Sequence, residues 1–166
     1  MTGVARVVVL ADTHLRPGRP RRLPDEVYAA LDKADAVLHA GDLVTADLLH
    51  ELSGFAPVHA VLGNNDFDLV GVLPETASVT LAGVRISLIH DSGPTAGREG
   101  RLARRFPNAD VVVFGHSHAP LDAVGLDGQR LFNPGSPTER RAQPRHTFGL
   151  LELDGGQVVR HRIVPL

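Results

Sequence analysis

The chain has 166 residues, enough for one domain with a substantial apolar core. Its 17 basic and 19 acidic residues give a formal net charge of −2, which argues against a protein that binds a phosphate backbone through bulk positive potential. Cysteine is absent, so disulfides, thiolate zinc sites and cysteine nucleophiles are all excluded.

The first apolar run is typical of a strand rather than of a signal peptide. Residues 4–11 form a short run that contains Arg6 and leads directly into the acidic Asp12. No window of the sequence approaches the ~20 apolar residues that cross a bilayer. We therefore expect a single domain over residues 1–166, with a cytoplasmic location and no membrane contact.

Short β-branched runs alternate with helical patterns over the first two thirds of the chain, as in a parallel sheet with crossover helices. Strands are predicted at residues 5–11, 35–41, 57–63 and 109–115. Helices are predicted at residues 24–34, 45–55 and 97–106, with Pro24 starting the first and Thr45 as a possible cap of the second.

The remaining apolar runs are separated by tight turns. Residues 78–90 contain two alternating runs about Ala82-Gly83, which predicts a hairpin. Turns at Asp127-Gly128 and Gly155-Gly156 each lie between apolar runs, so we expect antiparallel ribbons in the last third of the chain. The sequence therefore predicts an α/β sandwich of mixed sheets.

Metal-binding side chains follow each predicted strand. They are Asp12 and His14, then Asp42, then Asn64 with Asn65 and Asp66, then His90, then His116 and His118. In open α/β sheets, ligands collect at this carboxyl edge because the loops diverge there. Gly41, Gly63 and Gly115 each directly precede a candidate ligand, which permits a tight turn and a close approach of the backbone.

The spacing of the donors predicts convergence. In extended backbone the side chains at i and i+2 share a face, so Asp12 is expected beside His14, and His116 beside His118. Oxygen and imidazole donors without sulfur suit manganese, iron, cobalt, nickel or zinc rather than calcium. Seven donors are too many for one tetrahedral ion, and they suffice for two ions that share Asp42.

The ordered motifs D-x-H, G-D, G-N-x-D, H and G-H-x-H resemble those of the calcineurin-like metallophosphoesterase superfamily. The chain length and the N-P-G-S sequence at residues 133–136 resemble its small phosphodiesterase branch. The resemblance implies a four-layer α/β/β/α sandwich with two mixed sheets and a dinuclear site at the strand ends. It also implies the ligand sets, with Asp12, His14 and His118 on one ion, Asn64, His90 and His116 on the other, and Asp42 bridging the two.

The function implied by this resemblance is a metal-dependent phosphodiesterase that hydrolyses a small organic phosphodiester or a cyclic nucleotide through a metal-bridging hydroxide. We expect two divalent ions, manganese first, with iron, nickel, cobalt or zinc as alternatives. Asp42, Asn64 and Asn65 are the expected catalytic residues, and Asn65 and Arg16 are expected to bind substrate. Asn65 replaces a histidine of many family members, and an amide cannot protonate a leaving group, so activated diesters are favoured.

Two other functions stay open. The retromer scaffold subunit resembles the same branch, so a metal-binding protein-interaction scaffold is one alternative, and a nuclease is the other. The complete donor set favours catalysis over a scaffold, and the neutral charge disfavours nucleic acid as a partner. A homodimer is plausible on general grounds only.

Several other polar residues have simpler expected roles. Asp66 is expected to cap a loop or to fix a ligand, and Asp91 adds a carboxylate where the family usually has glycine. Asn133 is expected to bond a ligand or a loop. Arginines are expected on a solvated surface in residues 16–22, although they could reach substrate phosphate, and on a solvent face at 98, 101, 104 and 105. His39 is expected as a hydrogen-bonded core residue, and His50, His59, His146 and His161 as surface or strand residues.

Overall fold

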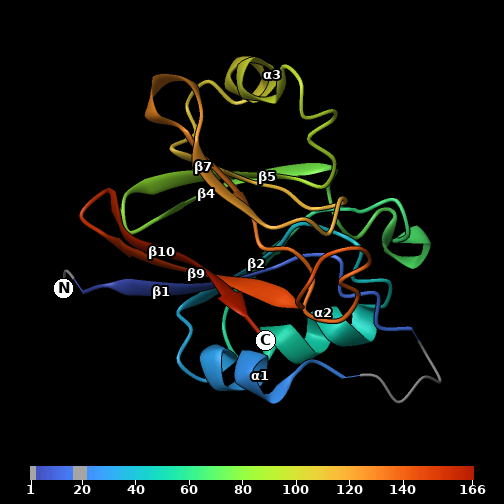
Figure 1. The fold of residues 1–166 in the computed structure, drawn as a ribbon. Coiled ribbons are helices and arrows are strands. Elements are labelled where there is room, and N and C mark those ends of the chain that lie inside the picture. The colour runs from blue at the N-terminus through green and yellow to red at the C-terminus, as the bar shows by residue number, and fades with distance from the viewer. Residues whose placement is uncertain (1–2, 17–21) are drawn as a thin grey trace.

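The computed structural model describes residues 3–16 and 22–166, and in this part of the chain two five-stranded sheets pack face to face (Figure 1). The first sheet has the order β10-β9-β1-β2-β3. Its strands are β1 (Ala5–Leu10), β2 (Ala36–His39), β3 (Val58–Ala60), β9 (Thr147–Asp154) and β10 (Gln157–Pro165). β1, β2 and β3 are parallel, whereas β9 and β10 run antiparallel to their neighbours.

The second sheet has the order β4-β5-β6-β8-β7. Its strands are β4 (Thr76–Leu81), β5 (Val84–Ile89), β6 (Val111–Val113), β7 (Leu121–Val124) and β8 (Arg130–Asn133). β5, β6 and β8 are parallel, and the edge strands β4 and β7 are antiparallel to them. Both sheets are therefore mixed, as expected.

Helices cover the outer faces of the two sheets. α1 (Asp25–Leu31) and α2 (Ala46–Ser53) lie below the first sheet, and α3 (Arg98–Arg105) lies above the second (Figure 1). Two short 3₁₀ turns, η1 (Phe67–Leu69) and η2 (Leu126–Gly128), complete the elements. The predicted four-layer α/β/β/α sandwich is confirmed. Within the described residues, no helix is both long and apolar enough to span a bilayer.

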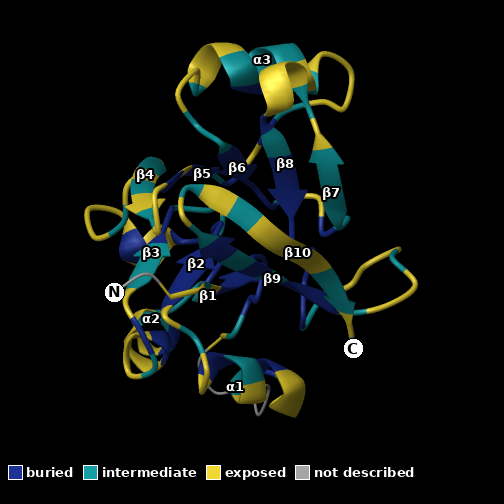
Figure 2. Ribbon diagram, turned by 90° about the vertical axis from the view of Figure 1, so that its left-hand side faces the viewer, coloured by how far each residue is buried: buried dark blue, intermediate teal, exposed yellow. Residues whose placement is uncertain are grey.

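The alternation of side chains along β1 explains the layering. Val7 and Val9 face the second sheet, whereas Val8 and Leu10 face α1 and α2. All four side chains are buried, and Figure 2 shows buried residues gathered in central strands such as β2 and β8. Burying a valine or leucine side chain contributes about 1.5–3 kcal/mol, so a strand that is apolar on both faces is held firmly in the middle of the sandwich. This strand carries Asp12 at its carboxyl end.

One local expectation was wrong and another held only in part. Thr45 occupies the position before α2, but its hydroxyl faces the carbonyl of Leu15 at 3.5 Å and does not cap the helix. On α3, Arg104 and Arg105 are exposed as expected, but Arg101 donates to the carbonyls of Ser92 and Pro94. Arg98 lies 5.0 Å from the ring centre of Phe114. Part of this helix surface therefore anchors the loop before it.

Gly149 gives a test of the packing between the sheets. It pairs with Val9, and a Cβ at this position would lie 2.4 Å from Cε1 of Phe132. We predict that Gly149→Ala destabilises the protein by about 1–3 kcal/mol, because the Phe132 ring must leave its place. Urea unfolding followed by circular dichroism measures this change.

The control is Gly100→Ala within α3, where a Cβ would meet only the ends of side chains, Nη1 of Arg104 at 3.2 Å and Cδ1 of Leu126 at 4.0 Å. This change should raise stability by about 0.5–1 kcal/mol, since alanine is the better helix former. Equal effects of the two substitutions would contradict the close packing at Gly149.

Candidate metal centre

The donor side chains meet because backbone hydrogen bonds join the loops at the carboxyl edge of both sheets. The amides of Asp12 and His14 donate to the carbonyls of Gly41 and Asp42 at 2.9 and 3.0 Å. Across the two sheets, the amide of His116 donates to Oδ2 of Asp12 at 2.9 Å. Backbone amides thus hold side by side loops that are distant in the sequence, with the Asp12 carboxylate joining the two sheets.

The backbone at the donors is not extended, so the reasoning from i and i+2 positions was wrong in its geometry. Five of the seven predicted ligands have positive φ: Asp12 (55°), His14 (46°), Asp42 (62°), His116 (74°) and His118 (60°). Each such residue stores about 1–3 kcal/mol of strain, and such residues cluster at functional sites. This backbone conformation directs the side chains of one loop to different donor groups. His118 therefore lies beside Asp12, whereas His116 lies beside His90.

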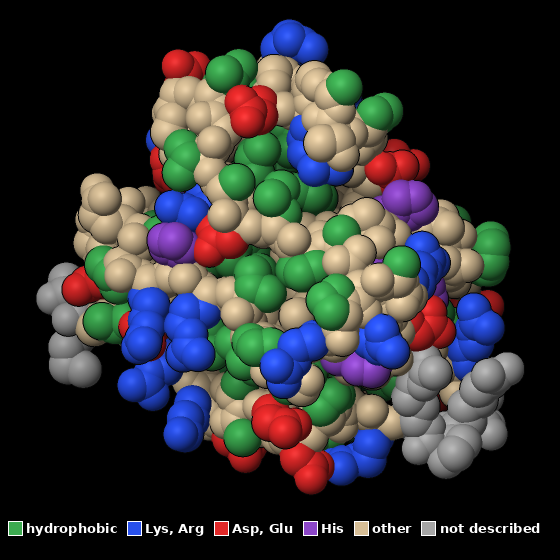
Figure 3. All heavy atoms as spheres, viewed as in Figure 1, with side chains coloured by type: hydrophobic (Ala, Val, Ile, Leu, Met, Phe, Trp, Pro, Cys, Tyr) green, Lys and Arg blue, Asp and Glu red, His purple; other side chains and the backbone are tan. Residues whose placement is uncertain are grey.

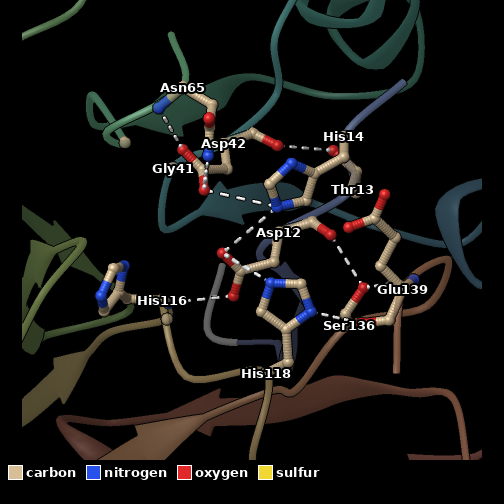
Figure 4. A network of polar contacts seen from close by, with 12 residues as sticks. Asp12, Thr13, His14, Gly41, Asp42, Asn65, His116, His118, Ser136 and Glu139 are labelled. Atoms are coloured by element: carbon tan, nitrogen blue, oxygen red, sulfur yellow. Dashed lines mark hydrogen bonds and ion pairs between the residues drawn. The ribbon is translucent and has the colours of Figure 1, made fainter. Parts of the chain in front are cut away.

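The first group of donors consists of Asp12, His14 and His118, whose side chains are buried. Oδ1 of Asp12 lies 3.7 Å from Nε2 of His118 and 4.0 Å from Nε2 of His14. Figure 4 shows the two rings turned toward this carboxylate. Among the described residues, none of these three atoms has a hydrogen-bond partner. Burying polar atoms without a partner is costly, which is the property expected of a cation pocket.

The second group adjoins the first and contains Asp12, Asp42 and His90. Nε2 of His90 lies 3.4 Å from Oδ2 of Asp42 and 3.9 Å from Oδ1 of Asp12. Asn64 and His116 extend this group, since Oδ1 of Asn64 lies 2.9 Å from Nε2 of His90 and 3.2 Å from Nδ1 of His116. All seven predicted donors therefore lie in two adjoining groups.

Asp42 lies between the groups. Its Oδ2 is 3.3 Å from Nε2 of His14 and 3.4 Å from Nε2 of His90. The amide of Asn65 donates to Oδ1 at 2.9 Å, and the side-chain amide of Asn65 donates to Oδ2 at 3.0 Å (Figure 4). Asp42 thus occupies the position expected of a bridging ligand, and Asn65 holds it there.

Asp66 holds the loops of Asp42 and Asn64 together. Its buried carboxylate accepts hydrogen bonds from the backbone amides of Asp42, Val44 and Gly63 at 2.7–2.8 Å. Gly63 is required here, because a Cβ would lie 2.1 Å from Oδ1 of Asp42. Of the two roles considered for Asp66, the structure favours support of a ligand loop.

Two ligand histidines are oriented by carbonyl oxygens behind them. Nδ1 of His90 donates to the carbonyl of Ala40 at 2.7 Å, and Nδ1 of His118 donates to the carbonyl of Glu139. Each ring therefore has its Nε2 lone pair free to face the site.

Ser136, the last residue of the N-P-G-S motif, and Thr138 after it complete the site, and the sequence reasoning gave neither hydroxyl a role. The hydroxyl of Ser136 donates to the carbonyl of Asp12 at 2.8 Å, and the hydroxyl of Thr138 donates to the carbonyl of Thr13 at 2.6 Å. The only sequence signal for these contacts was the presence of small hydroxyl residues beside a predicted turn. Asn133 bonds this loop region as expected, with its amide donating to the carbonyl of Gly115 at 3.3 Å.

The other polar residues fall outside the two groups. His39 is a buried core residue as expected, accepting from the amide of Gly41 at Nδ1 and facing the Thr13 hydroxyl at Nε2; burial lowers its pKa to about 3. Arg16 is exposed on the loop after His14, and residues 17–21, including two of the loop arginines, lie outside the described residues. Asp91 is within 3.9 Å of Nε2 of His116.

Burial sets the charges of the ligands. It raises the pKa of Asp12 to about 7, and it lowers the pKa of His14 and of His118. For Asp42, burial acts to raise the pKa, but the hydrogen bonds and charge of His90 and the hydrogen bonds from Asn65 outweigh it and hold the pKa below its usual range. The shifts favour neutral imidazoles at His14 and His118 and an ionised carboxylate at Asp42, whereas ionising Asp12 calls for a cation.

These features fit divalent cations. The pocket has buried donors without partners, nitrogen and oxygen ligands, and one carboxylate that resists ionisation. Asp12, His14 and His118 would hold one ion, and Asp42, His90, Asn64 and His116 would hold the other. The kind of ion is left open by donors of this type, which suit several first-row metals.

The raised pKa of Asp12 predicts pH-dependent metal binding. Below pH 7 a proton occupies the carboxylate and must leave before the ion binds, so the affinity for Mn²⁺ should be about tenfold weaker at pH 6 than at pH 8. Burial acts to lower the pKa of His90, but its hydrogen bond and the charges of Asp42 and Asp12 raise it, which adds to the effect in the same direction. Calorimetric titration of metal-free protein, with proton release measured in two buffers, tests this. An affinity that is constant over this range would contradict it.

Comparison with known proteins identifies the family of the chain. A family model described as the calcineurin-like phosphoesterase superfamily domain matches residues 6–156. A probable metallophosphoesterase of Methanothermobacter thermautotrophicus is 35% identical over 149 residues, which are 89% of this chain and 85% of that protein.

Two solved structures share the fold. Vacuolar protein sorting 29 of Cryptosporidium parvum superposes with a TM-score of 0.79 at 22% identity, over 97% of this chain and 96% of that chain. A protein described as a novel archaeal phosphodiesterase superposes with a TM-score of 0.72 at 20% identity, over 97% of this chain and 99% of that chain. With its ordered motifs, its two facing sheets and the match over residues 6–156, the chain belongs to the calcineurin-like phosphoesterase superfamily.

Proposed function

We propose that this protein is a dinuclear metal-dependent phosphodiesterase that hydrolyses a small organic phosphodiester or a cyclic nucleotide. The observation that carries the proposal is the pair of adjoining donor groups that share Asp12, with Asp42 between a histidine of each. Two divalent ions held there would polarise the phosphoryl oxygens and supply a water-derived nucleophile at neutral pH. Manganese is the ion we propose first.

The roles of the protein groups follow from their contacts. Asp42 would hold both ions, and Asn65 keeps its carboxylate in place through two hydrogen bonds. One N–H of the Asn65 side chain is used in this way, and the other remains as a donor for a phosphate oxygen. Asn64 is exposed at the edge of the second group, where it can contact both the ion and the substrate.

Asn65 also limits the chemistry. An amide does not donate a proton to a departing alkoxide, so the leaving group must be stable as an anion or draw its proton from solvent. This favours acidic leaving groups such as phenols over simple alcohols. It agrees with a diesterase of small activated substrates better than with a protein phosphatase.

A cavity beside the second donor group gives room for such a substrate. It has a volume of about 340 Å³ and is lined by Asn64 and His90 together with Glu75, Asp91 and Arg105. This volume suits a small molecule. A larger cavity of about 410 Å³ lies over Ser78, Arg85 and Asn108, outside both donor groups, so we assign the substrate to the smaller one.

A polymeric nucleic acid is disfavoured as the substrate. On the face shown in Figure 3, arginine and lysine side chains stand in separate groups with acidic side chains between them. A nucleic-acid groove usually presents a continuous basic track. The protein described as an archaeal phosphodiesterase has the same fold as this chain, so this fold is compatible with phosphodiester hydrolysis.

A protein-interaction scaffold is the second candidate. Phe67, Val70 and Val72 are 77%, 71% and 62% exposed on the segment that follows Asp66. Apolar side chains gathered on one exposed segment often mark a contact surface. A scaffold needs no hydrolysis of a substrate, so a test for turnover distinguishes it from a phosphodiesterase.

The first test is hydrolysis itself. Protein loaded with Mn²⁺ should hydrolyse bis(p-nitrophenyl) phosphate. In a series of aryl and alkyl phosphodiesters, the rate should fall as the leaving group becomes less acidic. Asp42→Asn should lower kcat/KM by at least about 100-fold, because it removes the charge shared by both ions.

The matched control is Asp47→Asn on the exposed surface of α2, which should keep full activity. Full activity of Asp42→Asn would contradict the assigned role of that carboxylate. Absence of turnover in fully metal-loaded protein would favour the scaffold.

Arg141 is a further candidate for contact with substrate phosphate. It follows the loop that Ser136 and Thr138 bind to the site, and within the described residues it makes no hydrogen bond or ion pair. Burial is the main influence on the pKa of Asp12, His14 and His118, and the positive charge of Arg141 is a further influence on all three. Its charge therefore acts on the first donor group.

We predict that Arg141→Gln raises KM for the diester by about fivefold to tenfold while binding Mn²⁺ slightly more tightly, because one positive charge attracts phosphate and repels the ion. Steady-state kinetics and calorimetry measure the two effects. Arg140→Gln is the control, since Arg140 donates to the carbonyl of Gln143. Weaker binding of both ion and substrate by Arg141→Gln would indicate a damaged loop instead.

A further inference from the structure

His116 is supported differently from the other ligand histidines. The side chains of His14, His90 and His118 are at most 6% exposed, whereas that of His116 is 44% exposed. His90 and His118 each donate to a backbone carbonyl behind the ring. Packing and backbone hydrogen bonds therefore orient His90 and His118, whereas the polar contacts of the His116 ring are with side chains.

The ring of His116 has one nitrogen toward the site and one away from it. Nδ1 lies 3.2 Å from Oδ1 of Asn64 and 3.3 Å from Nε2 of His90, within the second donor group. Nε2 faces outward and lies 3.9 Å from Oδ2 of Asp91. For Nδ1 to offer a lone pair, the proton of the neutral ring must be on Nε2.

The carboxylate of Asp91 is itself fixed. Its Oδ1 accepts a hydrogen bond from the amide of Gly93 at 2.8 Å, and Gly93 has a φ of +80° that suits this turn. Oδ2 is left to face His116. Because Asp91 directly follows His90, the position of this carboxylate is tied to a ligand of the same ion.

We propose that Asp91 is a positioning residue that keeps the proton of His116 on Nε2 and so turns the Nδ1 lone pair into the second donor group. A carboxylate favours the tautomer whose N–H points at it, and carboxylates behind metal-binding histidines commonly act in this way. Asp91 supplies to His116 what carbonyl oxygens supply to His90 and His118. The inference deepens the proposed function by naming a determinant of the second ion site, and it needs the ion site but not turnover.

Asp91→Asn tests the proposal without changing the shape of the loop. The amide oxygen can still accept from Gly93, but an NH₂ group then faces Nε2, which favours the opposite tautomer. In Zn²⁺-loaded protein, whose diamagnetic ion keeps the spectra sharp, the Nε2–H proton of His116 should resonate downfield in the parent, where it faces the carboxylate, and move upfield in the variant.

Metal binding gives the second readout. In a calorimetric titration with Mn²⁺, Asp91→Asn should weaken the second ion by about 10–100-fold and leave the first unchanged. Glu75→Gln is the control, because it removes a carboxylate from the same cavity without facing an imidazole; its effect should be about twofold or less.

An unchanged Nε2–H resonance of His116 in Asp91→Asn would overturn the proposal, as would equal loss of the second ion in Asp91→Asn and Glu75→Gln. Neither readout depends on hydrolysis, so a protein that binds two ions without turnover would refute the phosphodiesterase and still support the role of Asp91.

Discussion

A buried carboxylate oxygen without a hydrogen-bond donor is the constraint on which the site depends. Oδ1 of Asp12 is enclosed by imidazole nitrogens of His14, His90 and His118 within 4.0 Å, and it has no partner among the described residues. An isolated ion in such surroundings costs several kcal/mol, which is why burial raises the pKa of Asp12 to about 7. A cation removes that cost, and the same cation explains why Nε2 of His14 and Nε2 of His118 have no hydrogen-bond partner among the described residues.

The fold keeps this unfavourable arrangement in place. β1 is apolar on both faces and lies in the middle of the first sheet. The backbone that leads into Asp12 is therefore fixed by packing on both sides. Around it, Asp66 binds three backbone amides and Ser136 binds the carbonyl of Asp12. These hydrogen bonds oppose the strain of the positive-φ backbone, which a loosely held loop would relax. The rigid sandwich is therefore what allows the strained edge to exist.

Much of this arrangement could be predicted from the sequence because it depends on local signals. Apolar runs predicted the strands. The polar residues that follow these strands, among them Asp12, Asp42 and His116, predicted a common edge. The left-handed backbone at Asp12 and His118 could not be predicted, since non-glycine residues adopt it only where the surrounding structure enforces it. The hydrogen bond from Ser136 to Asp12 joins residues 124 positions apart and has no local signal. Asn65 shows the same limit, since its place in the motif gave no sign that it binds Asp42.

The central claim is that two cations occupy the adjoining donor groups. Diffraction from crystals grown with Mn²⁺, recorded just above the manganese absorption edge, locates such ions directly. Two anomalous peaks are predicted, one bounded by Asp12, His14 and His118 and the other by Asp42 and His90. Protein that binds Mn²⁺ only at other positions, with no peak beside Asp12, would contradict the claim.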